Sequence, residues 1–203
     1  GGMFVFSTSQ ISELLQFPVS ARDKGHLLDI GAGDGGVTAR CEQFFSAVDA
    51  TEVSSSMQWL LRKRGYNVVD EDYLATDHAK GRYDVVMCLN VMDRADKPWS
   101  LLRSIRSLVK PDGLVVLAIV LPWCPFVEVG NKQKAPEEAL PMTGGTCREG
   151  ARFEASISIM CERVLEPAGF EIVRWSRVPY MSEGSSTHEY YALDDALIVL
   201  KPK

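Results

Sequence analysis

The sequence predicts an α/β protein with a doubly wound, mostly parallel sheet of seven strands that closes with an antiparallel hairpin. Short apolar runs rich in Val, Ile and Leu alternate with segments whose apolar residues recur every three or four positions. Continuous apolar runs suit strands that are covered on both faces, as in a parallel sheet. The last two runs are joined by a loop of about nine residues, which leaves no room for a crossover helix. These two strands therefore pair antiparallel or lie in different places.

Local patterns predict the individual elements. Ser7 and Gln10 form a capping pattern that marks a short helix before the first strand. Gly65 and the Pro-Asp-Gly turn at 111–113 are stop signals for two later helices. The predicted strands cover residues 26–31, 45–52, 66–72, 83–90, 113–121, 170–180 and 190–202. The predicted helices lie within residues 7–17, 35–44, 54–65, 97–113 and 153–168.

The chain length predicts one domain, over residues 1–203. With 203 residues, 46% of them hydrophobic, the chain is long enough for one well-buried core and short for two. Segment 122–150 is the least regular part, with four prolines and the pair Gly144-Gly145. Such a stretch is usually a lid, a binding loop or disorder. Because it follows the fifth strand, at the edge where such sheets bind ligands, we expect it to form a lid or a substrate groove.

Composition argues against several classes of protein. The 22 basic and 27 acidic residues give a net charge of −5 without a basic cluster, so nucleic acid is not the expected partner. No run approaches the roughly 18 apolar residues that a membrane span needs. We expect an intracellular monomer, but Met3 follows two glycines, and residues upstream of it could carry targeting information. The five cysteines are odd in number and widely spaced, so we expect reduced thiols and no metal site.

The turn after the first strand, LLDIGAGDGG at 27–36, predicts a nucleotide-type cofactor. Gly31, Gly33 and Gly36 satisfy the G-x-G-x-x-G pattern of dinucleotide sites, although such glycines also serve tight packing. Asp29 and Asp34 beside this turn would repel a pyrophosphate. The two carboxylates suit a cationic amino group instead, which favours S-adenosylmethionine (SAM) with S-adenosylhomocysteine as the product.

Two further acids complete the predicted cofactor pocket. Glu52 ends the second strand, where a carboxylate can accept hydrogen bonds from ribose hydroxyls. Asp72 follows the third strand and could reach an adenine amino group. Each acid alone is more often a solvated loop residue, but at the ends of successive strands they predict a nucleoside pocket. With the strand order and the Asp-x-Gly-x-Gly turn, the chain resembles class I SAM-dependent methyltransferases.

Four later segments resemble the DREV family of methyltransferase-like proteins: CLNVMDRADKPWSLL, IVLPWCPFVE, VPYMSEG and YYALDDALIVLKP. That family methylates protein histidine at the pros nitrogen (Nδ1) in His-x-His contexts. The resemblance implies Asn90 and Asp93 as contacts of the acceptor histidine, Asn90 also beside the cofactor. It implies Tyr180 and Tyr191 as pocket walls or hydrogen-bond partners. Arg94 matches as well, without an assigned role.

The acceptor chemistry agrees with these residues. Neutral imidazole, with a pKa of about 6.5, is a competent nucleophile at one nitrogen when the proton sits on the other. A carboxylate such as Asp93 that accepts the tele N–H would fix that tautomer and stabilise the imidazolium. Alternatively, Asp93 caps the following helix, Asn90 merely ends a strand, and the tyrosines are core residues.

The substrate is expected to be another protein, because the three histidines of this chain form no His-x-His. Segment 122–150 and a loop at 179–189 would wall its groove, which Glu128, Glu137, Glu138 and Glu183 would make acidic. The absence of an (Asn/Asp)-Pro-Pro-(Tyr/Phe) motif after the fourth strand argues against base methylation. A SAM-dependent methyltransferase of small molecules is the main alternative. A non-catalytic SAM-fold module and a dehydrogenase are more distant ones.

Overall fold

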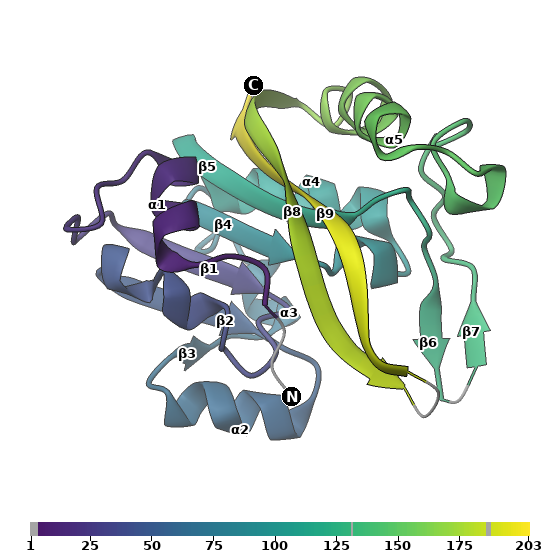
Figure 1. The fold of residues 1–203 in the computed structure, drawn as a ribbon. Helices are drawn as coiled ribbons and strands as arrows, with labels where there is room; N and C mark the ends of the chain where they lie inside the picture. Colours follow the sequence, from purple (N-terminus) through teal and green to yellow (C-terminus); the bar gives the residue numbers. More distant parts are fainter. Residues whose placement is uncertain (1–3, 131, 186–187) are drawn as a thin grey trace.

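A seven-stranded sheet runs through the computed structural model in the order β3-β2-β1-β4-β5-β9-β8 (Figure 1). The structure describes residues 4–130, 132–185 and 188–203, and only the backbone of residues 182–185 and 188–189. The strands of this sheet are β1 (His26–Ile30), β2 (Ala47–Thr51), β3 (Asn67–Val68), β4 (Tyr83–Leu89), β5 (Val109–Val120), β8 (Phe170–Ser185) and β9 (His188–Pro202).

The pairing confirms the predicted fold class. Strands β1 to β5 pair in parallel, whereas β9 pairs antiparallel with both β5 and β8. The predicted loop at 179–189 is wrong, because the β8–β9 pairing continues out to Ser185 and His188. Its polar sequence is typical of a loop, but an antiparallel ladder needs only backbone groups, so it extends past the last apolar residues. The hairpin therefore reaches beyond the rest of the sheet (Figure 1).

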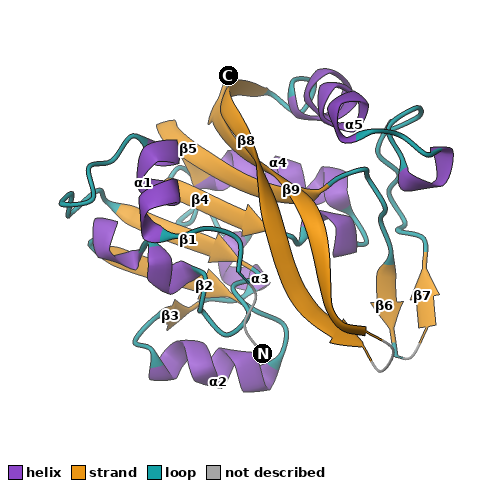
Figure 2. Ribbon diagram, viewed as in Figure 1, coloured by secondary structure: helices purple, strands orange, loops and turns teal. Residues whose placement is uncertain are grey.

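Helices cover both faces of the sheet (Figure 2). Because successive side chains of a strand point to opposite faces, Val85 and Met87 of β4 join one apolar cluster and Val86 and Cys88 another. The first cluster includes apolar residues of α1 (Thr8–Leu15), and the second includes those of α4 (Pro98–Leu108) and α5 (Phe153–Met160). Strand β4 is thus apolar on both faces, as its continuous run predicts.

Helix ends agree with the predicted signals in most places. The Ser7 hydroxyl accepts the Gln10 amide at 3.2 Å, and the Gln10 side chain accepts the Ser7 amide at 2.8 Å, so the predicted cap of α1 is confirmed. Helix α2 (Ser55–Lys63) ends before Gly65, and α5 continues as a π-helix over Cys161–Leu165. Helix α4 ends at Leu108 and β5 begins at the next residue. The Pro-Asp-Gly sequence at 111–113, predicted to end the helix, therefore lies inside β5.

At two places the structure has a different secondary structure from the predicted one. Residues 35–44 form two 3-10 turns, Thr38–Arg40 and Glu42–Phe44, instead of a helix, because Gly35 has a φ of +75° and glycine disfavours the helix. The third strand ends at Val68, since Asp70 caps the short helix α3 (Glu71–Leu74). Asp72 therefore lies on α3 and not at the end of a strand.

A disulfide between Cys124 and Cys147 closes segment 122–150, so the expectation of reduced thiols is wrong for this pair. Backbone hydrogen bonds from Trp123 to Gly145 and from Cys147 to Trp123, of 3.2 and 3.0 Å, place the two strands of the loop side by side. The Cα atoms of the two cysteines are consequently 5.4 Å apart. The segment also contains β6 (Val127–Val129) and β7 (Lys132–Lys134), which pair as a small hairpin.

Of the helices in the described residues, none has the length and apolar character that a membrane crossing requires.

We expect mass spectrometry after alkylation of the unfolded, unreduced protein to find three of its five cysteines modified: Cys41, Cys88 and Cys161. Because the bond closes a loop of 23 residues, Cys124→Ser should lower the free energy of unfolding by about 3 kcal/mol in urea denaturation. Cys161→Ser is the matched control and should cost less. Alkylation of all five cysteines would contradict the cross-link.

Candidate active site

The glycine turn lies where the carboxyl ends of β1 and β2 meet. Gly31 has a φ of +70°, and a Cβ atom there would lie 2.5 Å from a methyl group of Val91, so only glycine fits. Its amide donates to the hydroxyl of Thr51 at 3.2 Å, and the Ala32 amide donates to the Thr51 carbonyl at 3.0 Å. Gly33 also has a positive φ, of +56°. The turn is therefore fixed to the end of β2.

Asp29 is buried beside this turn. Its Oδ2 accepts the Thr38 hydroxyl at 2.6 Å, and burial raises the pKa of its carboxyl to about 7, with Thr38 opposing and Glu52 adding to the rise. In the described part of the chain no ion pair is formed by Asp29. A small cavity next to it is lined by Val5, Asp29, Gly31, Ala32, Val37, Leu89 and Asn90. A buried carboxyl group without a cation beside a cavity fits a ligand with an ammonium group.

The other predicted cofactor acids, Asp34, Glu52 and Asp72, are less buried than Asp29. Asp34 is 40% exposed, accepts the Gly36 amide at 2.8 Å and lies 4.0 Å from Arg64. Glu52 accepts the amides of Gly33, Val53 and Ser54 at 2.8 to 3.0 Å, so it already holds the glycine turn. Asp72 is exposed on α3. The structure thus brings Glu52 to the turn, keeps Asp34 in the turn with its side chain partly exposed, and leaves Asp72 on the surface.

Asn90 stands at the end of β4 in the left-handed conformation, with a φ of +57°, which asparagine tolerates better than most residues. Its backbone amide donates to the Ala118 carbonyl at 2.9 Å. Its side-chain Nδ2 donates to Oδ2 of Asp195 at 2.8 Å. Asn90 is therefore held in place from β5 and β9, the next two strands of the sheet.

Asp93 lies in the 3-10 turn that follows β4 and is only 4% exposed. Its Oδ2 pairs with Arg94 at 2.5 Å, and the Arg94 guanidinium stacks 3.8 Å from the ring centre of Phe126. Burial raises the pKa of the Asp93 carboxyl, while Arg94 opposes that rise. Asp93 does not cap α4, since Lys97 occupies that position, and the simplest structural explanation of this acid is excluded.

The two predicted tyrosines differ in burial. Tyr180 on β8 is 5% exposed, whereas Tyr191 on β9 is 37% exposed. Burial, followed by the charges of Asp195 and Asp93, raises the pKa of Tyr180 to about 12. The structure thus brings Tyr180 close to both acids and places Tyr191 nearer to solvent.

Asp195 is a residue of this site that the sequence reasoning missed. It is fully buried on β9, opposite Val120 of β5, and burial raises its pKa to about 7. Among the described residues, Asp195 Oδ1, Asp93 Oδ1 and Asn90 Oδ1 are buried without a hydrogen-bond partner. A signal was present in the sequence, because acids at 194 and 195 interrupt an otherwise apolar closing strand.

The buried acid Asp49, in the middle of β2, provides a contrast. Its two oxygens accept hydrogen bonds from Asn67 and Tyr83, at 2.9 and 2.8 Å. Full pairing of this kind is the rule for buried polar groups. The other unpaired buried side-chain atom in the described chain is Nε2 of His26, 3.2 Å from Asp49. The three unpaired oxygens, of Asn90, Asp93 and Asp195, gather at the edge of the sheet where ligands bind.

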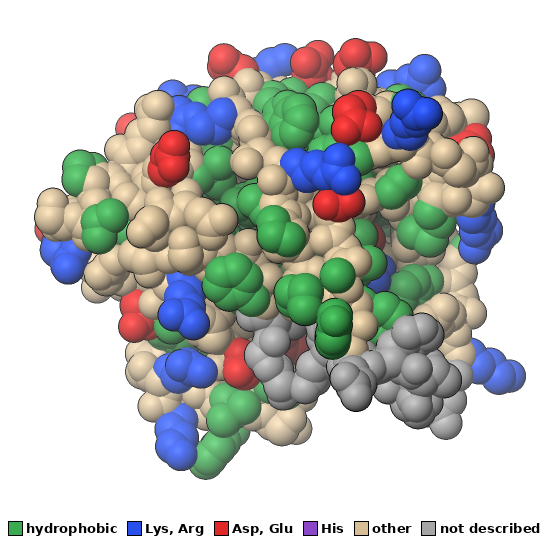
Figure 3. All heavy atoms as spheres, in the orientation of Figure 1, with side chains coloured by type: hydrophobic (Ala, Val, Ile, Leu, Met, Phe, Trp, Pro, Cys, Tyr) green, Lys and Arg blue, Asp and Glu red, His purple; other side chains and the backbone are tan. Residues whose placement is uncertain are grey.

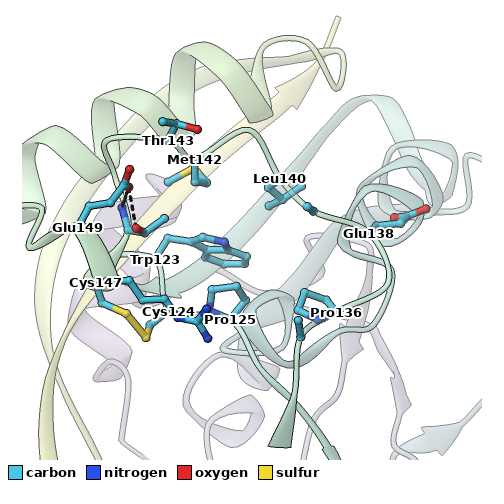
Figure 4. Close-up of a pocket in the computed structure, with 14 residues that line it drawn as sticks. Trp123, Cys124, Pro125, Pro136, Glu138, Leu140, Met142, Thr143, Cys147 and Glu149 are labelled. Carbon is cyan, nitrogen blue, oxygen red and sulfur yellow. Dashed lines mark hydrogen bonds between the residues drawn. A yellow bond between two sulfur atoms is a disulfide. The ribbon is translucent and has the colours of Figure 1, made fainter.

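Segment 122–150 encloses a separate pocket of about 440 Å³ (Figure 4). Trp123 and Leu140 face it from opposite sides, and the disulfide lies at its rim (Figure 4). Its lining includes none of Asn90, Asp93 and Tyr180. The segment is nevertheless joined to the site, because the Phe126 amide donates to the Asp93 carbonyl at 3.0 Å.

Two of the four acids expected to make the groove acidic lie beside cationic side chains. Glu137 pairs with Lys97 at 3.2 Å, and Glu138 lies 3.6 Å from Arg103. Glu128 is exposed on β6, and the side chain of Glu183 lies outside the described residues. The exposed large apolar side chains of the hairpin, among the described residues, are Trp175, Met181, Tyr190 and Tyr191. Figure 3 shows several hydrophobic side chains gathered in the middle of the face it draws.

Comparison with known proteins gives a family match over almost the whole chain: the model of the DREV methyltransferases covers residues 1–202. The chain is 27% identical over 199 residues to the non-reducing polyketide synthase ausA of Aspergillus calidoustus, a match that spans 87% of this chain and 8% of that protein. It is 30% identical over 97 residues to a ubiquinone biosynthesis O-methyltransferase of Bordetella avium, over 44% of this chain and 40% of that enzyme. The matches thus span less than half the length of either relative.

Solved structures agree with the fold. Magnesium protoporphyrin IX methyltransferase from Synechocystis, crystallised with SAM, is similar over 96% of this chain and 77% of its own, with a TM-score of 0.57 and 15% identity. The similarity at this level of identity concerns the fold of SAM-dependent methyltransferases.

We expect the ligand-free protein to lose stability as the pH rises from about 4 to 7. The pKa values of Asp29 and Asp195 are raised from 3.8 to about 7, so in this range the folded state keeps protons that the unfolded state has lost. Each group then lowers the free energy of unfolding by at most about 1.4 kcal/mol per pH unit. Urea denaturation at several pH values measures this slope. Asp29→Asn and Asp195→Asn should each flatten it, and an unchanged slope in both variants would contradict the assignment.

Proposed function

Because this chain belongs to the DREV methyltransferase family and uses SAM as its cofactor, we propose that it methylates the pros nitrogen of histidine in His-x-His segments of other proteins. The acceptor pocket would be formed by Asn90, Asp93, Tyr180 and Tyr191.

The observation that carries this proposal is the group of buried acceptor oxygens on Asn90, Asp93 and Asp195 that lack partners among the described residues. A buried acceptor left unpaired costs about 1–3 kcal/mol, so the site is completed by a ligand that brings hydrogen-bond donors. A histidine side chain within a peptide brings an imidazole N–H together with backbone N–H groups. Such a ligand also leaves one imidazole nitrogen free as a nucleophile.

The cofactor residues proposed are Asp29, Gly31, Gly33, Asp34, Glu52, Asp72 and Asn90. Asp29 would hold the amino group, since it is a buried acid beside the small cavity and has no cation partner in the described chain. Glu52 already accepts hydrogen bonds from three backbone amides. Its remaining lone pairs would accept hydrogen bonds from the ribose hydroxyls. Asp34 and Asp72 fit less directly, because Asp34 is partly exposed beside Arg64 and Asp72 lies at the surface.

In the proposed mechanism, SAM when bound supplies an electrophilic methyl group on a sulfonium. Oδ1 of Asp93 accepts the tele N–H of the histidine, which leaves the lone pair on the pros nitrogen. Arg94 occupies the other oxygen of Asp93, so one oxygen remains for the substrate. The charge of Asp93 would stabilise the imidazolium that forms when the methyl group passes from the sulfonium sulfur to the pros nitrogen, and the tele proton would then pass to solvent.

A small-molecule acceptor is the second candidate, favoured by the printed activity of the Bordetella avium relative, an O-methyltransferase of ubiquinone biosynthesis. Incubation with labelled SAM and either a His-x-His peptide or a panel of small amines, phenols and acids separates the two. Mass spectrometry and NMR should locate the label on the pros nitrogen of the peptide. Label on small molecules alone would overturn the proposal in favour of the second candidate.

We expect SAM to bind about tenfold more tightly at pH 7 than at pH 5.5. The cationic amino group requires ionised Asp29, whose pKa of about 7 means that the charged fraction grows with pH over this range. Calorimetry at several pH values measures this dependence. Asp29→Asn should weaken binding and remove most of the pH dependence, whereas the same dependence in that variant would assign it to another group.

Asp93→Asn should lower the rate of methyl transfer to the peptide by about 100-fold or more, because the neutral amide cannot stabilise the imidazolium. Its affinity for SAM should change by less than about threefold. Asp77→Asn is a matched control, since Asp77 is an exposed acid paired with Lys80, and it should behave like the unmodified protein. A rate for Asp93→Asn equal to that of the control would remove Asp93 from the mechanism.

A further inference from the structure

We propose that Asp195 is a positioning residue that fixes the side-chain amide of Asn90, so that its oxygen faces the acceptor pocket. The inference rests on the proposed function for its catalytic consequence, and on the geometry alone for the orientation of Asn90.

The hydrogen bond between the two residues joins parts of the chain that are 105 positions apart. Asn90 ends β4 and Asp195 lies on β9, and these strands are separated by β5 in the sheet. Asp195 pairs in register with Val120, the last residue of β5, so the bond passes over the end of that strand. The antiparallel direction of β9 is what brings an interior residue of the closing strand to the edge where the parallel strands end.

The chemistry of the pair sets the orientation of the amide. Nδ2 of Asn90 donates to Oδ2 of Asp195 in the structure. This direction is enforced above the pKa of Asp195, which burial raises to about 7, because an ionised carboxylate only accepts hydrogen bonds. The Asn90 oxygen then points elsewhere, and it is buried without a partner among the described residues. Without Asp195, the amide could rotate and present either its oxygen or its nitrogen to a ligand.

Asp195 is suited to this task by its surroundings. It is fully buried, and its burial is not explained by an ion pair in the described chain, where its partner is Asn90. The charged and titratable groups that act on it or lie beside it are Asp93, Asp194 and Tyr180. An acid buried next to other acids is a cost to the fold, and a role in orienting the site accounts for its presence.

The test combines a double-mutant cycle with an NMR measurement on the full chain. At saturating SAM, Asp195→Ala should lower the rate of methyl transfer to a His-x-His peptide by about 10- to 100-fold. Asp195→Asn keeps one acceptor oxygen and should recover part of the rate. Because Asp195 acts through Asn90, adding Asp195→Ala to Asn90→Ala should cause little further loss.

Asp194→Asn serves as the matched control. Asp194 is the preceding residue, but it pairs with Arg177 at 2.7 Å and is 46% exposed, so its loss should leave the rate unchanged. Thermal unfolding of each variant checks that it is folded. Fully additive losses in the double variant, or a normal rate in Asp195→Ala, would overturn the inference.

Side-chain NMR tests the orientation without any acceptor. The Asn90 amide resonances, identified by their loss in Asn90→Ala, should show a protected, hydrogen-bonded NH₂ that exchanges faster in Asp195→Ala. Unchanged resonances would overturn the inference even if histidine is not the acceptor. If the unmodified protein methylates no His-x-His peptide but Asp195→Ala alters these resonances, the proposed function fails and the positioning role stands.

Discussion

Burial of carboxyl groups at one edge of the sheet is the constraint on which the site depends. Asp29, Asp93 and Asp195 lie at this edge with little or no exposure to water, and burial raises the pKa of each. Charged groups in such positions destabilise a fold unless ligands or neighbours compensate them. The core on both faces of the sheet supplies the stability that allows this arrangement.

The three acids are compensated to different degrees. The Arg94 guanidinium pairs with one oxygen of Asp93. The Asn90 amide donates to one oxygen of Asp195, and the Thr38 hydroxyl donates to one oxygen of Asp29. Each acid therefore keeps capacity for a further donor. Under the proposed function, Asp29 marks a cofactor region beside the glycine turn, and Asp93 and Asp195 mark an acceptor region beyond Asn90. Asn90 lines the small cavity and also binds Asp195, so it belongs to both regions.

The sequence was sufficient for the fold class, since apolar runs and stop signals are local features that show strands alternating with helices. It also located Asn90 and Asp93, which directly follow such a run. The missed features depend on contacts between distant residues. Asp195 is recognised as a site residue only through its hydrogen bond to Asn90 across β5. The Cys124–Cys147 bond depends on the folding back of its loop. The long hairpin depends on backbone pairing, which the side chains do not encode.

The Cys124–Cys147 bond makes the molecule sensitive to the compartment in which it is made. Thiols stay reduced in a cytosol and are oxidised in secretory compartments and in the bacterial periplasm. In a reducing environment, segment 122–150 would be held by its backbone hydrogen bonds and by the contact of Phe126 with Asp93 and Arg94. Preparations of one and the same sequence from two hosts would then differ in how firmly this segment is held against Asp93 and Arg94.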